Sequence, residues 1–305
     1  MKKVYLLFTI SYLLLSVAAF GSTPYISKVY DFLPGMGQFV NVYPKYQTGD
    51  TKADIIQKVE TAICNDNQGL ISLGGWGGYI VFGFDHMVEN VKDEYDFIVL
   101  GNAFEGNAEP GIVMVSYDKN GNGEPDDEWF ELAGSEYGSK ACWYNVDSTY
   151  RREADTIKNP FHKQPYYPQW LEEDEYTLHG TILPKNAVYT TMWVLNPFGF
   201  GYADNYPNDD DRAKLKIDWA VNSAGQPVTL PGIHFVKVYN GMDQTCGDLG
   251  ETSTEVTGAT DLHLRTEIEK LNAKRSTLNA KRLIDGQIII QSGDRTFNLL
   301  GQPIH

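Results

Sequence analysis

Hydrophobic and polar positions follow the two-residue period of β-strands along most of the chain. Short runs of Val, Ile, Tyr, Phe and Trp alternate with turns rich in Gly, Asn, Asp and Pro. This pattern predicts strands at residues 79–84, 97–100, 112–117, 129–133, 188–195, 216–220 and 235–239. Many short strands with frequent turns are typical of an antiparallel β-sandwich, which we expect here in a jelly-roll-like form.

One segment near the N-terminus departs from the strand pattern. Between residues 50 and 69, apolar side chains recur at helical spacing, namely Ile55, Ile56, Val59, Ala62 and Ile63. Asp50 or Thr51 can cap such a helix, and Gly69 can end it. We therefore expect a mainly β body with a single short helix.

The two ends of the chain differ from the body. Residues 1–21 contain two lysines, an apolar run and then small residues, which is the pattern of a secretory signal peptide cleaved after Ala19 or Gly21. The alternative is a membrane anchor, for which the run is short. The sequence predicts a body at 22–265 and a helical or charged linker at 266–282. A small β tail at 283–305 has predicted strands at 288–291 and 296–299.

The charge of the chain restricts its partners. The formal net charge is −15, and without residues 1–21 it is −17, with 23 basic against 40 acidic residues. Such a surface repels nucleic acid and anionic lipid, and it suits an extracytoplasmic protein or one that collects divalent cations. The odd number of cysteines, Cys64, Cys142 and Cys246, permits at most one internal disulfide and leaves the pairing open.

The stretch DKNGNGEPDDEW, residues 118–129, has oxygen-bearing side chains at alternate positions and a glycine sixth. That is how an EF-hand-type calcium loop begins, but its twelfth position is Trp129 where the usual loop has Glu. Acidic residues later in the stretch must then supply the ligand that Glu provides in the usual loop. The predicted calcium ligands are Asp118, Asn120, Asn122, Glu124, Asp126 and Asp127. The alternative is a plain polar hairpin turn, because Asn-Gly pairs favour such turns.

Other acidic residues indicate no defined chemistry. Residues 204–205 and 209–211 form an acidic run without the required glycine, so we expect a solvated loop, with a second cation site as the alternative. The histidines lack zinc-type spacing, and no Gly-x-Ser-x-Gly motif is present. Glu105, Glu251 and Glu255 are the first acids to consider for a glycosidase, although the expected role of each is in a turn or at a rim. No catalytic residue is predicted.

Two aromatic segments are candidates for ligand binding. Trp76 lies in GGWGG, where glycines let the backbone approach closely, and we expect a structural turn rather than a stacking platform. PYYPQW offers Tyr166, Tyr167 and Trp170, which can stack on sugar rings or plug the end of a sandwich. These four side chains are the candidate ligand-binding residues.

Longer segments carry two resemblances. GQIIIQSGDRTFNLLGQPI resembles the C-terminal sorting tails of Bacteroidetes proteins, which implies export by the type IX secretion route. The segments ISLGGWGGYIVFGFDHMVENV, YDFIVLGNAFEGN, EPGIVMVSYDKNGNGEPDDEWFELAGSEY, QPYYPQW, FGFGYADN and GETSTEVTG resemble a group of uncharacterised Bacteroidetes cell-surface proteins, some of which carry PKD domains. No PKD module is recognisable here. The association of that family with outer-membrane uptake genes, including those for cobalamin, implies a corrinoid ligand and an uptake or secretion machinery as alternatives.

Together these observations predict an exported surface or secreted protein that binds a ligand without catalysis and is stabilised by calcium. Carbohydrate is the first expected ligand, because it suits aromatic loops on a calcium-braced sandwich. The alternatives are a surface accessory for cobalamin capture and a glycoside-active enzyme. No nucleic-acid partner, and no membrane span after cleavage of the signal peptide, is expected.

Overall fold

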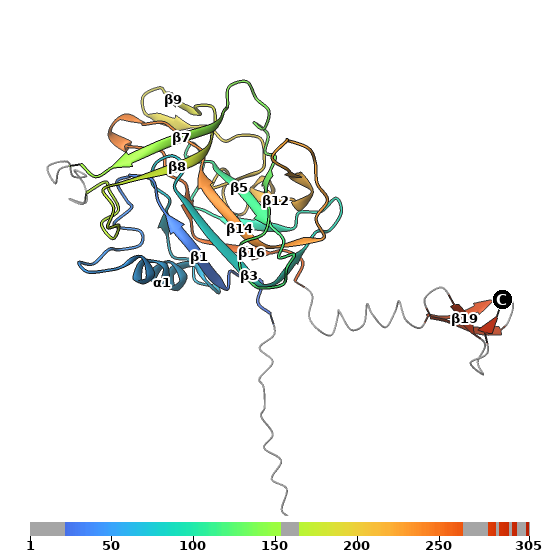
Figure 1. Cartoon of the computed structure of the whole chain (residues 1–305). Helices are drawn as coiled ribbons and strands as arrows, with labels where there is room; N and C mark the ends of the chain where they lie inside the picture. The colour runs from blue at the N-terminus through green and yellow to red at the C-terminus, as the bar shows by residue number, and fades with distance from the viewer. Residues whose placement is uncertain are drawn as a thin grey trace, which may run out of the picture. The chain divides into compact units, whose positions relative to one another are not determined.

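The main sheet of the protein has seven antiparallel strands (Figure 1). The computed structural model describes residues 22–153 and 165–264, together with the backbone of four strands between residues 280 and 304. The strands of the main sheet are β1 (Lys28–Leu33), β3 (Tyr79–Glu89), β5 (Gly111–Ser116), β6 (Trp129–Leu132), β11 (Tyr202–Ala203), β13 (Ala220–Val221) and β14 (Gly232–Asn240). Their order is β1-β3-β14-β5-β6-β13, and β11 pairs with β5.

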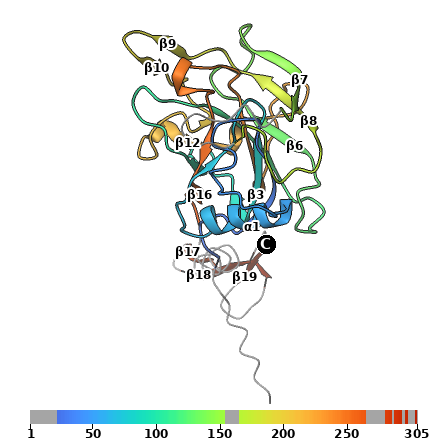
Figure 2. The ribbon, with the colours of Figure 1, turned by 90° about the vertical axis from the view of Figure 1, so that its left-hand side faces the viewer.

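A second layer faces one side of this sheet. It contains the three-stranded sheet of β12 (Lys214–Leu215), β4 (Phe97–Leu100) and β16 (Gly258–Asp261), and the short pair of β2 (Ile71–Ser72) and β15 (Glu255–Val256). The helix α1 (Lys52–Ile63) packs against β1 and β2 (Figure 2). The layers thus combine antiparallel sheets with a single α-helix in the described part of the chain.

The hydrophobic core lies between these layers. Alternate residues of the main sheet point into it, among them Phe82, Val115 and Val236. Phe97 from β4 and Val59 from α1 belong to the same buried cluster. Each such side chain contributes about 1.5–3 kcal/mol on burial. The prediction of a mainly β antiparallel sandwich is confirmed, whereas its jelly-roll character stays a prediction.

The predicted helix is confirmed, although it ends earlier than predicted. The side chain of Thr51 caps α1 by accepting the N–H of Asp54, and the carboxylate of Asp54 accepts the N–H of Thr51, which completes a capping box. The buried face consists of Ile55, Val59 and Ile63. The helix ends at Ile63, well before Gly69.

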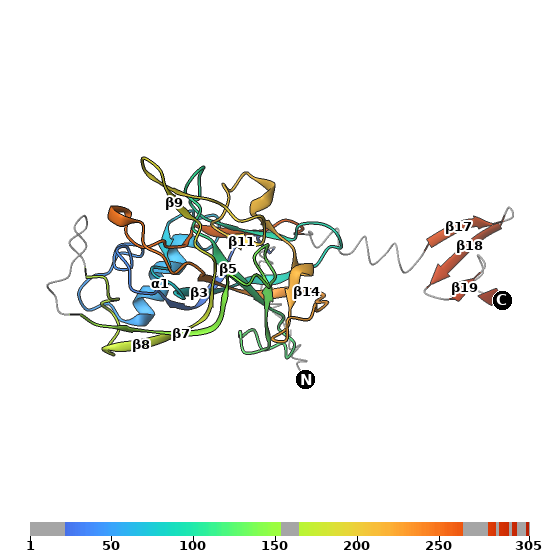
Figure 3. The same cartoon turned by 90° about the horizontal axis from the view of Figure 1, so that it is seen from above.

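Two hairpins flank the main sheet (Figure 3). One consists of β7 (Trp143–Arg151) and β8 (Glu175–Ile182), and the other of β9 (Ala187–Tyr189) and β10 (Trp193–Leu195). The prediction of one strand at 188–195 is wrong, because the chain reverses there and the N–H of Thr190 donates to the carbonyl of Met192.

Three short 3₁₀ helices complete the body: η1 (Asp211–Ala213), η2 (Ile217–Trp219) and η3 (Gly247–Leu249). The predicted strand at 216–220 is wrong, because η2 occupies most of it. The buried carboxylate of Asp96 accepts the N–H of Ile217 at 2.7 Å, a contact that local sequence does not reveal. Cys64, Cys142 and Cys246 are all free and buried, so none forms a disulfide.

The C-terminal strands belong to a unit separate from Thr23–Leu264. They are β17 (Ala280–Ile284), β18 (Gln287–Ser292), β19 (Arg295–Phe297) and β20 (Pro303–Ile304), in an antiparallel sheet of that order. The two tail strands predicted from the sequence correspond to β18 and β19. The predicted signal peptide at 1–21 and most of the predicted linker, residues 266–279, lie outside the described residues, while residues 280–282 belong to β17. Within the described residues, no helix has the length and apolar character needed to cross a membrane.

Candidate functional site

The outer face of the main sheet, opposite the core, carries a row of side chains that crosses four strands. The pairing places Val81 beside Lys237, Lys237 beside Met114, and Met114 beside Glu131. Their strand neighbours, such as Val236, point into the core. Because side chains alternate between the faces of a strand, this row points outward.

Two neighbouring cavities of about 540 and 390 Å³ lie on this outer face. They share Met114, Trp129 and Lys237, and together we call them the sheet-face groove. Aromatic rings line much of it, namely Tyr30, Tyr79, Trp129, Tyr137 and Tyr144, beside the buried Tyr239. Its polar side chains include Asp31, Glu124, Glu131, Asn145, His179 and Asn222. The groove thus combines ring faces with hydrogen-bonding groups.

The candidate calcium loop forms one wall of the sheet-face groove. Residues 117–128 join β5 to β6, and Ser116 pairs with Trp129 at the base of this hairpin. Glu124 and Pro125 line the groove. The loop is tied to β1, because the hydroxyl of Tyr30 donates to the carbonyl of Gly123 at 3.0 Å.

The first half of the loop is folded around Asp118. One carboxylate oxygen accepts the N–H groups of Gly121 and Asn122, and the other accepts the N–H of Gly123 at 2.9 Å. These bonds hold the pKa of Asp118 below its ordinary value despite the opposing effect of desolvation. The side-chain oxygen of Asn120 accepts the N–H of Asn122, and that of Asn122 accepts the N–H of Glu124. Each of these two amide oxygens accepts one hydrogen bond and keeps a second lone pair for a cation.

The second half of the loop returns to the first. Asp127 accepts the N–H groups of Lys119 and Asn120, and Asp126 accepts the side-chain amides of Asn120 and Asn122, both at 3.0 Å. The six predicted calcium ligands therefore lie in one hairpin loop, and the later acids fold back as the sequence predicts. Calcium binding itself stays a prediction.

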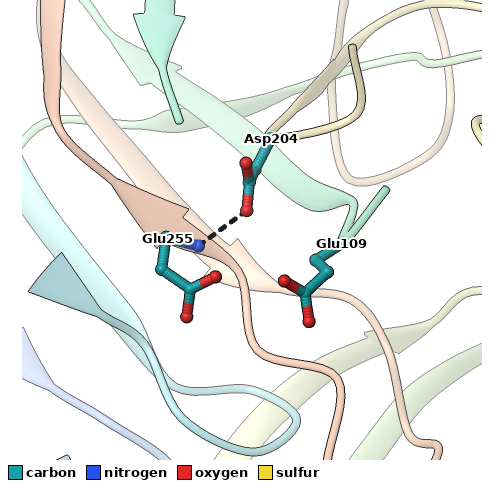
Figure 4. A group of neighbouring side chains, drawn as sticks. All are labelled: Glu109, Asp204 and Glu255. Atoms are coloured by element: carbon teal, nitrogen blue, oxygen red, sulfur yellow. Dashed lines mark hydrogen bonds between the residues drawn. The ribbon is translucent and has the colours of Figure 1, made fainter. Parts of the chain in front are cut away.

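A second group of carboxylates lies within the body, where distant segments meet (Figure 4). Glu109, Asp204 and Glu255 each place one carboxylate oxygen within 4.8 Å of the others. In the described part of the chain, this is the one group of three acidic, His or Cys side chains so close together. We call it the carboxylate cluster. Of its members, sequence reasoning singled out Glu255, expected Asp204 in a solvated loop, and missed Glu109.

Asp204 is the most constrained member, and its prediction as a solvated loop residue is wrong. It is buried, and one carboxylate oxygen accepts the N–H groups of Asn102 and Ala103 at 2.8 Å, while the other accepts that of Glu255 at 2.9 Å. A side chain at Gly101 would overlap this carboxylate. The GNA turn after β4 thus binds Asp204 through its backbone. Of the other run members, Asn205 is also buried, contrary to the prediction, whereas Asp209 and Asp211 are exposed, as expected.

Burial raises the pKa values of all three acids in the cluster. Desolvation and the charge of Glu109 raise the pKa of Asp204 to about 8, although its three N–H partners oppose the shift. Desolvation, with the charges of Glu109 and Asp204, raises the pKa of Glu255 well above its usual range. Desolvation also raises the pKa of Glu109, although the hydrogen bond from the N–H of Ser253 opposes this shift. Three acids this close can share protons or hold a cation.

Glu109 and Glu255 also line a cavity of about 350 Å³, which we call the acidic cavity. Glu251 lies on the same cavity, accepts the N–H of Gln38 at 2.6 Å, and has its pKa raised to about 7 by desolvation. Amides and rings surround these acids, namely Gln38, Asn102, Asn107, Phe39 and Tyr43. Glu255 is a buried residue of β15, so its prediction as a turn or rim residue is wrong, whereas Glu251 is half-buried and follows the η3 turn. Glu105 is exposed and does not line this cavity.

The predicted aromatic ligand residues lie elsewhere. Trp76, Tyr167 and Trp170 are buried, so their rings are not available as a stacking platform, and this prediction needs correction. The indole N–H of Trp76 donates to the carbonyl of Thr181 at 3.0 Å, and Trp170 stacks on Phe32 in the core. Glycines around Trp76 serve close backbone packing, which confirms the structural interpretation of GGWGG. Tyr166 is half-buried and lines neither the groove nor the acidic cavity.

No protein-family model matches this chain, and no curated protein matches it either. The resemblances to Bacteroidetes surface proteins and to sorting tails therefore stay predictions from the sequence.

Proposed function

We propose that this chain is an exported cell-surface or secreted protein that binds a carbohydrate in the sheet-face groove without chemical conversion. The observation that carries the proposal is the groove itself, in which aromatic rings and hydrogen-bonding side chains line one open face of the main sheet. Sugars present apolar ring faces and hydroxyl edges, so they need both kinds of contact. The signal-like N-terminus and the acidic surface support a location outside the cytoplasm.

Calcium has a structural role in this proposal. The loop at 118–127 would hold the ion through Asp118, Asn120 and Asn122, with further oxygens from Glu124, Asp126 and Asp127. Because Glu124 and Pro125 line the groove, a bound ion would fix the groove wall. Loops of this type in extracellular modules bind calcium with Kd of about 10⁻⁴–10⁻³ M.

A glycan-binding measurement with two matched variants tests the proposal. Tyr144 lines the groove and is 42% exposed, whereas its neighbour Trp143 is 67% exposed and does not line it. A panel of immobilised glycans should retain the full-length protein in calcium. Tyr144→Ala should weaken retention about tenfold, and Trp143→Ala should leave it unchanged. Equal effects of both changes, or no retained glycan, would count against the groove.

A second candidate function is glycoside hydrolysis, and the acidic cavity is the observation that favours it. Glu109 and Glu255 both line it, their carboxylate oxygens lie within 4.8 Å, and Glu251 lies on its wall. Retaining glycosidases place two carboxyl groups about 5–5.5 Å apart. A reducing-sugar assay over the same glycans decides this point. If the protein hydrolyses a glycan and Glu109→Gln or Glu255→Gln abolishes this activity, the result would support an enzymatic function. If no glycan is hydrolysed, binding remains the proposed function.

A further inference from the structure

Lys237 brings a cation to the floor of the sheet-face groove without an anionic partner. It lies on β14 near the middle of the main sheet, and it lines both cavities of the groove. Its ammonium lies 4.3 Å from the centre of the Tyr79 ring. Within the described residues it makes no ion pair and no hydrogen bond. Burial holds the pKa of Lys237 below its ordinary value, although the charge of Asp31 opposes this.

Asp31 is the acid whose charge acts on Lys237, but its carboxylate is already bound by other groups. It forms an ion pair of 2.7 Å with Lys52, accepts the hydroxyl of Tyr79 at 2.7 Å, and accepts the N–H of Phe32 at 2.9 Å. Its negative charge is thus matched by Lys52. The ammonium of Lys237 still has three donors with no acceptor in the described structure.

Glu131 is an acidic side chain on the same surface that also lacks a partner of opposite charge. It lies on β6, faces the groove, and has no hydrogen bond or ion pair within the described residues. Burial alone raises the pKa of Glu131 to about 7. Because Glu131 is half-buried and faces the groove, its carboxyl group can accept a hydrogen bond from a ligand there.

The two groups are held apart by the sheet. β5 lies between their strands, and Met114 stands between them in the cross-strand row. Strands are about 4.8 Å apart, so the two Cα atoms are separated by about 9–10 Å. Lys237 and Glu131 therefore face the same aromatic-lined groove as two separate charged side chains.

We propose that the ligand of the sheet-face groove is a sugar acid whose carboxylate pairs with Lys237 while its hydroxyl groups donate to Glu131. The inference rests on the proposed function of the groove. A carboxylate supplies the acceptors that Lys237 lacks, and a hydroxyl supplies the donor that Glu131 lacks. The ring of the same sugar packs on Trp129 or Tyr144, which line the groove beside Glu131.

The charge of the protein limits the ligand to few carboxylates. The chain has a net charge of −15, and Asp31, Glu124 and Glu131 all line the groove around Lys237. A polyanion would meet repulsion on all sides of this one cation. We therefore expect an oligosaccharide with a single acidic unit rather than a long uronate polymer.

Calorimetric titration of the full-length protein with paired probes tests this assignment. One pair is an aldobiouronic acid and its carboxyl-reduced disaccharide, and another is sialyllactose and lactose. At least one acidic member should bind about tenfold more tightly than its neutral counterpart, the minimum expected from one charge-assisted contact. Polygalacturonate serves as the polyanionic probe and should bind more weakly than the preferred single-acid sugar.

Two lysine variants test whether the preference for the acidic sugar depends on Lys237. Lys237→Met removes the charge and keeps the apolar stem, so it should abolish the preference for the acidic probe. Lys216→Met is the matched control, because Lys216 also lies over a tyrosine, at 5.0 Å from the Tyr95 ring, but outside the groove. A thermal melt of both variants confirms that each remains folded.

The outcomes separate this inference from the proposed function. A preference that Lys237→Met removes and Lys216→Met leaves intact supports it. If acidic and neutral sugars bind equally well and Tyr144→Ala weakens both, the groove is a carbohydrate site but the assignment of a sugar acid is overturned. If no sugar binds at any concentration tested, both the assignment and the proposed function fail.

Discussion

The hydroxyl of Tyr30 on β1 donates a 3.0 Å hydrogen bond to the carbonyl of Gly123, at the tip of the β5–β6 loop. The bond joins residues 93 positions apart in the chain. Because Tyr30 also lines the sheet-face groove, it links the candidate calcium loop directly to the candidate ligand surface. A change in the order of the loop should therefore reach the groove.

Tyr30→Phe tests this link. The change removes the hydrogen bond to Gly123 and keeps the ring, so the free energy of unfolding should fall by about 0.5–1 kcal/mol, as for one exposed neutral bond. Urea denaturation in calcium measures the loss. Tyr25→Phe is the control, because the Tyr25 hydroxyl makes no hydrogen bond within the described residues. Equal losses in both variants would mean that the link contributes nothing specific.

The carboxylate cluster should make stability depend on pH. The pKa of Asp204 is raised to about 8 and that of Glu255 also lies well above its ordinary value, so the folded protein keeps protons that the unfolded chain releases near pH 4. The folded state then binds more protons than the unfolded state between about pH 4 and 8, and the free energy of unfolding falls as pH rises through that window.

Glu255→Gln should reduce this fall by an amount on the order of 1–3 kcal/mol. Denaturation curves at pH 5 and pH 8.5 measure it, with the exposed Glu105→Gln as a matched control. An unchanged difference between the two pH values in Glu255→Gln would contradict a proton-sharing cluster. The raised pKa values of Glu131 and Glu251, both about 7, should leave a residual slope.

Gly101→Ala should be among the more damaging single-methyl changes in the body. Its new methyl group would overlap the carboxylate of Asp204, which three backbone N–H groups hold in place. Overpacking of this kind costs about 1–3 kcal/mol or more. Gly138→Ala is the control, because open space surrounds Gly138 and only its positive φ of 79° opposes the change. Urea denaturation compares them, and an equal or smaller loss for Gly101→Ala would contradict the close packing.

Local pattern was sufficient for the elements that local forces define. The predicted strand at 97–100 matches β4 without error, because a short apolar run there is bounded by polar residues. The helix followed from its apolar spacing and from the cap at Thr51. In contrast, β7 and β8 were missed. Most side chains of β7 are exposed, and Gly180 interrupts the apolar face that Tyr176, Leu178 and Ile182 form in β8.

The candidate sites also differ in whether local sequence reveals them. The 118–127 loop was visible because its oxygens repeat at alternate positions in one stretch. The carboxylate cluster was not, because Glu109, Asp204 and Glu255 come from three distant segments and only the fold brings them together. Lys237 and Glu131 carry no sequence signal either, since each is a single charge in an otherwise apolar or aromatic strand.

Thermal unfolding of the full-length protein in chelator and in ~10 mM calcium tests the central claim most directly, namely that the 118–127 loop is a calcium-held wall of the binding groove. At a Kd of about 10⁻⁴–10⁻³ M, calcium should raise Tm by about 3–10 °C. Asp118→Ala should abolish the rise, whereas Glu255→Gln should preserve it, because Glu255 lies in the carboxylate cluster. No rise in the unaltered protein, or a rise that Glu255→Gln removes and Asp118→Ala leaves intact, would contradict the claim.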